Sequence, residues 1–109
     1  MSTPTKEGKN IAVIAHFTIV GSLIAMSMNG ETKSDFARFY TRQAFGIHLL
    51  FIAFSIFNSL YFSQLALYGI YVTYIVLWGY SFIAALNNKK QSIPVLGPYF
   101  QKWFTFIQY

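Results

Sequence analysis

The sequence predicts an all-α integral membrane protein: a single domain over residues 1–109, with three transmembrane helices and a short amphipathic interfacial C-terminal helix. Composition is the first reason, because hydrophobic residues make up 55% of the chain and charged residues only 10%. A soluble domain is usually about 25% charged. The second reason is that residues 10–30 and 43–88 contain no Asp, Glu, Lys or Arg. Neither stretch has the alternating pattern of membrane β-strands, so we expect helices.

The first span is predicted over residues 10–28. A hydrocarbon core about 30 Å thick needs roughly 20 helical residues to cross it. A signal peptide is the alternative, with Lys6 and Lys9 as its basic region. An apolar run of about 19 residues exceeds the usual length of such a region, so we expect a retained helix.

The second and third spans are predicted over residues 43–62 and 65–86. As one helix, the charge-free stretch 43–88 would be about 69 Å long, so it must reverse and cross twice. Ser63 and Gln64 are the most polar point for that reversal. Aromatic residues flank them, as is typical of the headgroup level.

Lys and Arg counts predict the orientation. The 29–42 loop and the C-terminal tail together carry six basic residues, whereas the N-terminal segment carries two. We therefore expect a bacterial inner-membrane protein whose loop and tail lie on the cytoplasmic side and whose N-terminus lies outside.

Two segments beside the spans have amphipathic patterns. Residues 34–42 begin with Ser34, a good N-cap, and Asp35, which suits a helix N-terminus. This segment is either an interfacial helix or an early start of the second span. In residues 98–108, Pro98 suits a first helical position, and apolar residues follow at helical spacing. An interfacial helix is expected there, and a surface packed against a partner subunit is the alternative.

Three short motifs carry a resemblance to a known family: residues 14–16 (IAH), 36–44 (FARFYTRQA) and 93–97 (IPVLG). In this order they resemble a broad bacterial family of small membrane proteins of unknown function. That family is related to the twenty-kilodalton Tic protein, a proposed channel component of chloroplast inner-envelope import. The resemblance spans most of residues 10–100 and implies the three-span layout. The chain departs from it in an unbroken first apolar run and in His48, where relatives tend to have Gln or another polar residue.

The spans offer little chemistry. They hold no Asp, Glu, Lys or Arg, which ion pumps and proton relays need. His16 and His48 could ligate haem or a metal. In straight spans, however, they would lie about 13 Å apart along the membrane normal. We expect each to hydrogen-bond to a neighbouring helix or to interfacial water, with no cofactor, no metal and no enzymatic activity. Contact with a cofactor on another chain stays open.

Packing is the predicted use of the remaining side chains. Small and polar residues suit helix–helix contact: Gly21, Ala25, Ser55, Asn58 and Ser59. Tyr68, Tyr71, Tyr74 and Trp78 form a stripe on the third span, either for packing and partner contact or lining a ligand cleft. Basic residues outside the spans would dock on anionic headgroups or on an acidic partner, or only set the topology: Arg38, Arg42, Lys89, Lys90 and Lys102.

These features predict a non-catalytic accessory or scaffolding subunit of a larger membrane assembly. Its partners would be membrane lipids and other membrane subunits or further copies of itself. The net charge of +5 does not predict nucleic-acid binding, because the basic residues flank the apolar runs. The alternative, implied by the resemblance, is an oligomeric component of a translocation or transport channel, with Thr18, Ser22, Asn58 and Thr73 lining its path.

Overall fold

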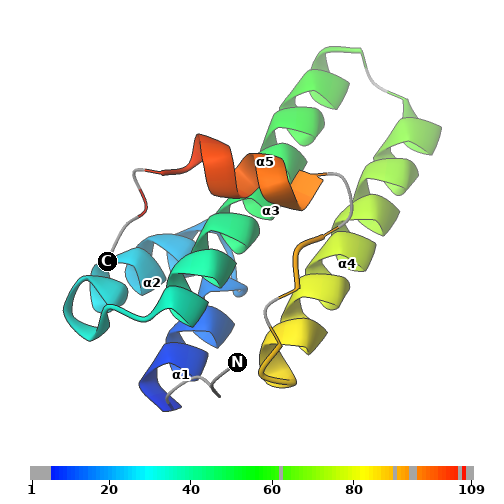
Figure 1. The fold of residues 1–109 in the computed structure, drawn as a ribbon. Helices are drawn as coiled ribbons and strands as arrows, with labels where there is room; N and C mark the ends of the chain where they lie inside the picture. The colour runs from blue at the N-terminus through cyan, green and yellow to red at the C-terminus, as the bar shows by residue number, and fades with distance from the viewer. Residues whose placement is uncertain (1–5, 62, 90, 94–95, 106, 108–109) are drawn as a thin grey trace.

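The structure is a computed structural model that describes residues 6–61, 63–89, 91–93, 96–105 and 107. Five helices follow one another (Figure 1), and the described residues contain no strand. They are α1 (Lys6–Ala15), α2 (Ile19–Thr32), α3 (Asp35–Leu60), α4 (Gln64–Leu86) and α5 (Leu96–Trp103). The all-α prediction is therefore confirmed for the described part of the chain.

The predicted first span is wrong. Residues 10–28 belong to two helices, α1 and α2, which are separated at residues 16–18. Thr18 caps α2, its hydroxyl accepting a hydrogen bond from the Gly21 N–H at 3.3 Å. A Cβ on Gly21 would lie 2.3 Å from the Ile14 carbonyl oxygen, so glycine is what allows α2 to return so closely along α1. Three spans are not supported.

The second and third predicted spans are α3 and α4, the two described helices that are long and apolar enough to cross a membrane. Ser34 caps α3, so the second helix starts early and residues 34–42 are not a separate interfacial helix. Ser63 caps α4, which confirms the predicted reversal. In the turn, the Asn58 side-chain oxygen accepts a hydrogen bond from the Ser63 N–H at 3.4 Å.

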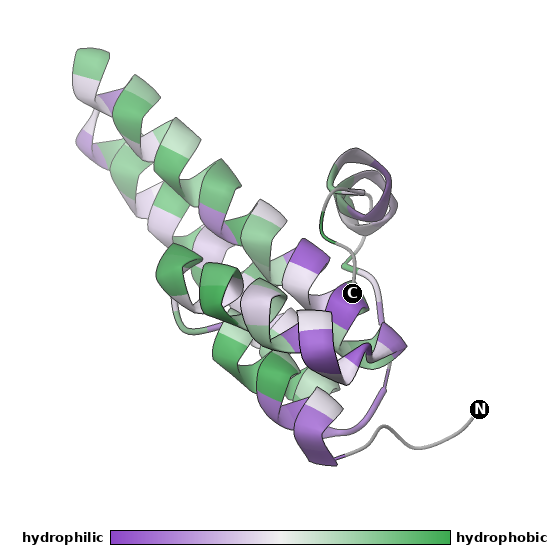
Figure 2. Ribbon diagram, turned by 90° about the vertical axis from the view of Figure 1, so that its left-hand side faces the viewer, coloured by the Kyte–Doolittle hydropathy of each residue, from purple (hydrophilic) through white to green (hydrophobic). Residues whose placement is uncertain are grey.

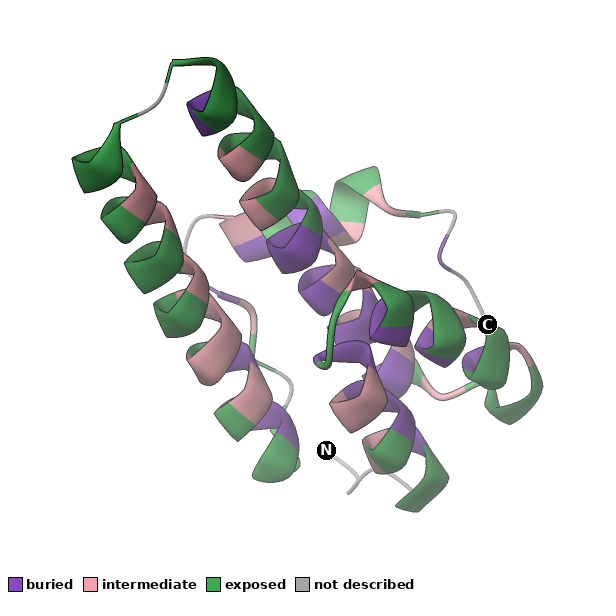
Figure 3. Cartoon of the chain, turned by 180° about the vertical axis from the view of Figure 1, so that it is seen from behind, coloured by how far each residue is buried: buried purple, intermediate pink, exposed green. Residues whose placement is uncertain are grey.

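The molecule divides into a packed base and a projecting arm (Figure 1). We define the arm as residues 49–73, the second half of α3 and the first half of α4, and the base as the rest of the described chain. Nearly all buried residues lie in the base (Figure 3), and Asn58 is the one buried residue among those described in the arm. The arm consists mostly of hydrophobic residues (Figure 2), and many of its large apolar side chains are exposed. The molecule is accordingly elongated, at 45 × 23 × 21 Å.

The tail helix α5 packs on its own chain. It begins two residues before Pro98, the predicted first position, and it crosses α3 in Figure 1. The ring of Phe100 lies where a Cβ on Gly46 would be, within 2.6 Å, so this glycine admits the ring. Phe100 is buried, whereas Tyr99 and Trp103 are exposed. Residues 106, 108 and 109 of the predicted tail segment lie outside the described residues.

Candidate functional site

The end of α1 lies inside the base and is surrounded by hydrogen-bond donors. The last four carbonyls of an α-helix have no partner within the helix. Here the carbonyls of residues 12–16 all accept hydrogen bonds. The donors to Val13 and Ile14 are the next turn's N–H groups of His16 and Phe17, each at 3.1 Å. The other three carbonyls receive side-chain donors, mostly from elsewhere in the chain.

His16 starts a chain of hydrogen bonds across three helices. Its Nδ1–H donates to the Ala12 carbonyl oxygen at 2.7 Å, which leaves Nε2 to accept from the Ser81 hydroxyl at 2.7 Å. The Ser81 oxygen in turn accepts from the Gln43 side-chain amide at 2.8 Å. His16, Ser81 and Gln43 are almost completely buried. Because a carbonyl can only accept, the direction of the whole chain follows from Ala12.

Gln43 extends this chain to the segment before α5. Its amide also donates to the Gln91 carbonyl oxygen at 3.2 Å, and its own oxygen accepts from the Ile93 N–H at 2.9 Å. Tyr40, one turn earlier on α3, donates to the Lys89 carbonyl oxygen and accepts from the Gln91 N–H. The chain leaving α4 is thereby fixed to α3 by side chains rather than by backbone pairing.

His48, on α3, bonds to the same last turn of α1. Its Nε2–H donates to the Ala15 carbonyl oxygen at 3.2 Å, and its Nδ1 accepts from the Tyr74 hydroxyl at 3.0 Å. The Ser22 hydroxyl donates to the same carbonyl at 2.7 Å. Residues 10–28 do not form the straight span that was expected to separate His16 from His48, and the short, returning first region brings both histidines beside one helix end.

We call these residues the polar junction: His16, Ser22, Gln43, His48, Tyr74, Trp78 and Ser81. Trp78 completes it by donating its ring N–H to the His16 carbonyl oxygen. In each histidine the ring nitrogen without a proton already accepts a hydrogen bond, so neither presents a free lone pair to a metal. Among the described residues no group of three or more His, Cys, Asp or Glu could hold a metal ion.

One buried polar atom stands apart from the junction. The Thr41 hydroxyl is the single buried side-chain oxygen or nitrogen for which the described residues provide no hydrogen-bond partner. Buried hydroxyls are usually paired.

The predicted helix-packing residues are divided between base and arm. Gly21 and Ala25 are buried in the base. Ser55 is half-buried, and the exposed Ser59 donates its hydroxyl to the Ile56 carbonyl oxygen of its own helix. Asn58 bonds within the α3–α4 turn rather than across to another helix. The structure therefore does not bring the five residues together.

The predicted aromatic stripe on α4 is divided in the same way. Tyr74 and Trp78 lie in the base, where they are half-buried and donate hydrogen bonds to His48 and to the His16 carbonyl oxygen. Tyr68 and Tyr71 are about half exposed on the arm, at 57% and 48%. The ring centroids of Tyr71 and Phe51 are 5.3 Å apart, which is packing between the two arm helices.

The basic residues have different partners. Arg42 donates from Nε to the Ile107 carbonyl oxygen at 3.0 Å and from Nη1 to that of Gln101 at 3.3 Å, so it holds the tail. Arg38 forms an ion pair with Asp35 at 2.7 Å. Lys89 and Lys102 are exposed, and Lys90 lies outside the described residues.

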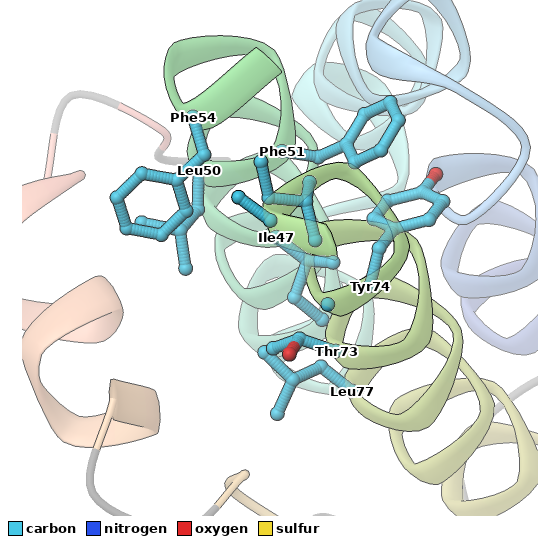
Figure 4. A pocket seen from close by; sticks show the side chains of 10 residues that line it. Ile47, Leu50, Phe51, Phe54, Thr73, Tyr74 and Leu77 are labelled. Carbon is cyan, nitrogen blue, oxygen red and sulfur yellow. The ribbon is translucent and has the colours of Figure 1, made fainter. Parts of the chain in front are cut away.

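A groove of about 270 Å³ opens between α3 and α4 where the arm joins the base (Figure 4). Its walls are apolar except for Thr73 and Tyr74, and the Tyr74 hydroxyl is already bonded to His48. The labelled side chains come from both helices: Ile47, Leu50, Phe51, Phe54, Thr73, Tyr74 and Leu77. Such a lining can accept hydrocarbon, but it offers no convergent set of polar groups for a polar ligand.

Three junction residues were not singled out from the sequence as site residues: Ser22 as a hydrogen-bond donor, Gln43 and Ser81. The same holds for Tyr40, which bonds to the segment after α4. Gln43 and Ser81 do carry a sequence signal, because they are uncharged polar residues near the two ends of the charge-free stretch 43–88. If that stretch folds back on itself, its two ends meet. Their partner His16 could not be inferred in this way, because it lies in a separate apolar run.

The fold and the junction together define a class: an all-helical chain with a two-helix apolar arm on a hydrogen-bonded base. No family model matches the sequence, and no curated protein or solved structure matches it.

Proposed function

We propose that this chain is a non-catalytic accessory or scaffolding subunit that packs against a larger assembly in a bacterial inner membrane. In this proposal α3 and α4 cross the bilayer, and the 29–42 loop and the tail lie on the cytoplasmic side. At about 1.5 Å per residue, their 26 and 23 residues are about 39 and 35 Å long, enough for a core of about 30 Å.

The observation that carries the proposal is the uncovered arm. Large apolar side chains on both of its helices are exposed: Ile52, Phe54, Ile56, Phe57, Leu60, Leu65, Tyr68, Tyr71 and Val72. Lipid can cover the aliphatic ones. Tyrosine hydroxyls within the bilayer are better served by protein, because lipid tails offer them no hydrogen bond. Tyr71 therefore favours a protein partner on this face. Tyr68, whose hydroxyl accepts a hydrogen bond from the Gln64 side-chain amide at 3.0 Å, adds exposed aromatic surface on the same helix.

The polar junction supports a structural role rather than a catalytic one. Both ring nitrogens of His16 and of His48 are used in hydrogen bonds within the base, three of them to other helices. A general base or a ligand-binding histidine needs a nitrogen that the substrate or metal can reach. The junction instead stabilises the base on which the arm stands.

Purification from native membranes in mild detergent, followed by native mass measurement, tests the proposal. We expect a partner subunit or a second copy to be retained by the natural chain and lost in a Tyr68→Ala, Tyr71→Ala double variant. Tyr99→Ala, Trp103→Ala is the matched control, because it removes two exposed aromatic side chains from α5 instead. A stable lone monomer of the natural chain, in several mild detergents, would overturn the proposal.

The channel alternative rests on the resemblance to the Tic-related family. Its polar path meets an obstacle within one chain, because the Ser22 hydroxyl is bonded to Ala15 and Asn58 caps the distant α3–α4 turn. A path would therefore need several copies, with Thr73 and other groove residues facing it. Conductance or solute flux across liposomes containing the purified oligomer would favour this alternative, and its absence across preparations would favour the accessory subunit.

A further inference from the structure

We infer that α1 and α2 form a re-entrant hairpin that enters and leaves the membrane on the cytoplasmic side. The exposed face of α2 then lies against the acyl chains of that leaflet, and the N-terminus lies on the same side as the tail. This inference rests on the proposed membrane location of α3 and α4. It replaces the expected external N-terminus.

Length comes first. With 10 and 14 residues, α1 and α2 are about 15 and 21 Å long, so neither crosses a hydrocarbon core of about 30 Å. The close approach of Gly21 to Ile14 shows that α2 turns back along α1 instead of continuing in its direction. A chain that turns back after about half the bilayer thickness leaves on the side where it entered.

The exposed residues along α1 and α2 are polar, then apolar, then polar again, as a re-entrant hairpin requires. At the start of α1 the exposed side chains are polar: Lys6, Glu7 and Asn10. At and just after the end of α2 they are polar again: Glu31, Thr32 and Lys33. Between them the exposed large side chains are all apolar: Phe17, Val20, Leu23, Ile24 and Met28. The corner of the hairpin is therefore its apolar end, and both of its open ends are polar.

At the corner of the hairpin, the carbonyl groups at the end of α1 have hydrogen-bond partners within the protein. A helix that ends in hydrocarbon exposes carbonyl groups, which is tolerated only where protein satisfies them. Here the carbonyls of residues 12–16 all have donors, including His48 from α3 and Trp78 from α4. The polar junction thus explains how the chain can turn within the membrane.

Charge identifies the leaflet. The start of α1, the α2–α3 connection and the end of α4 all lie at the end of the molecule away from the α3–α4 turn (Figure 1). Seven described basic residues lie on these ends and on α5: Lys6, Lys9, Lys33, Arg38, Arg42, Lys89 and Lys102. Each exposed basic side chain near an anionic surface contributes about 1 kcal/mol. The partner is therefore an anionic, cytoplasmic leaflet.

Labelling of single cysteines tests the topology, because the chain has no natural cysteine. Glu7→Cys, Thr32→Cys and Gln91→Cys should react with a membrane-impermeant maleimide from one side of sealed vesicles. Gln64→Cys should react from the other side. If Glu7→Cys reacts together with Gln64→Cys, the re-entrant hairpin is overturned while the two-span arm survives. If Thr32→Cys and Gln64→Cys react from the same side, the proposed membrane-crossing arm itself fails.

Spin labels test contact between α2 and lipid. Val20 and Glu31 are eleven residues apart and thus on the same exposed face of α2. In vesicles of phosphatidylcholine and phosphatidylglycerol, a label at Val20→Cys should collide with oxygen severalfold more, relative to a water-soluble nickel chelate, than a label at Glu31→Cys. Equal ratios at the two positions would show that the outer face of α2 is not in the membrane and would overturn the inference.

Discussion

The base and the arm are both helical, yet different interactions hold their helices together. In the base, the buried set includes polar side chains from every one of α1's neighbours, and almost all of them are hydrogen-bonded. In the arm, the two helices pack through aromatic rings such as those of Phe51 and Tyr71, whose centroids are 5.3 Å apart. The packing of the base is therefore specific, because a buried polar group is stable only beside a matching hydrogen-bond partner. The arm is adaptable, because apolar surface fits lipid or protein equally well.

Substitutions in the base and in the arm should therefore affect stability differently. Because its side chains are buried and hydrogen-bonded, removing even a few atoms from the base should lower the free energy of unfolding. Substitutions at exposed positions of the arm should change it little. Each of the following comparisons pairs a change that should be damaging with a similar change that should be mild or stabilising.

The largest effect is expected for His16→Ala. It removes the donor to Ala12 and the acceptor for Ser81, and it leaves a cavity beside Tyr40, whose ring centroid lies 5.8 Å from that of His16. A loss of about 3–5 kcal/mol in unfolding free energy follows. Thermal or denaturant unfolding in detergent measures it. In the arm, Gln64→Ala removes an exposed hydrogen bond to Tyr68 and should cost less than about 0.5 kcal/mol. Equal losses would contradict the division into base and arm.

Two glycines should respond with opposite signs. Gly21→Ala places a methyl group 2.3 Å from the Ile14 carbonyl oxygen and should cost about 1–3 kcal/mol. Gly69→Ala has no neighbouring atom within 4 Å and should stabilise the arm by about 0.5–1 kcal/mol, since alanine favours the helix. Unfolding midpoints under one set of conditions compare them. A stabilised Gly21→Ala variant would mean that α1 and α2 are not as close as the structure has them.

The two arginines of α3 should differ in their effect on the tail. Arg42→Gln removes donors to the Ile107 and Gln101 carbonyls and should cost about 1–2 kcal/mol, with faster proteolytic cleavage after residue 103. Arg38→Gln removes an ion pair whose two side chains are 30% and 63% exposed and should cost about 0.5 kcal/mol or less. Timed proteolysis with mass detection measures both variants. Faster cleavage in Arg38→Gln than in Arg42→Gln would refute the role assigned to Arg42.

The smallest effect separates the two halves of the aromatic stripe. Tyr74→Phe removes only the hydroxyl that donates to His48 and should cost about 0.5–1.5 kcal/mol. Tyr71→Phe changes a half-exposed tyrosine of the arm and should leave the stability of the isolated chain unchanged within about 0.5 kcal/mol. The same unfolding assay applies. If Tyr71→Phe proves the more damaging of the two, the arm is less tolerant than its exposure indicates.

Local signals predicted much of the fold. Ser34 and Ser63 were recognisable as caps and turn residues, and they do cap α3 and α4. The start of the tail helix was two residues late, because Pro98 suits any position of the first turn. The candidate site was predictable only in part. His16 and His48 could be singled out because they are polar residues inside apolar runs, but the sequence did not indicate their hydrogen-bond partners.

The α3–α4 hairpin follows from local pattern alone, because 46 consecutive residues without charge are too long for one crossing and carry one polar reversal point. The break in the first apolar run, in contrast, depends on contacts between helices. As a local pattern, residues 10–28 suit a straight helix of membrane length. The helix stops at Ala15 because Ser22, His48 and Trp78 together satisfy the carbonyls that a break exposes. Those donors come from three different helices, so the break is stable only once the helices have packed.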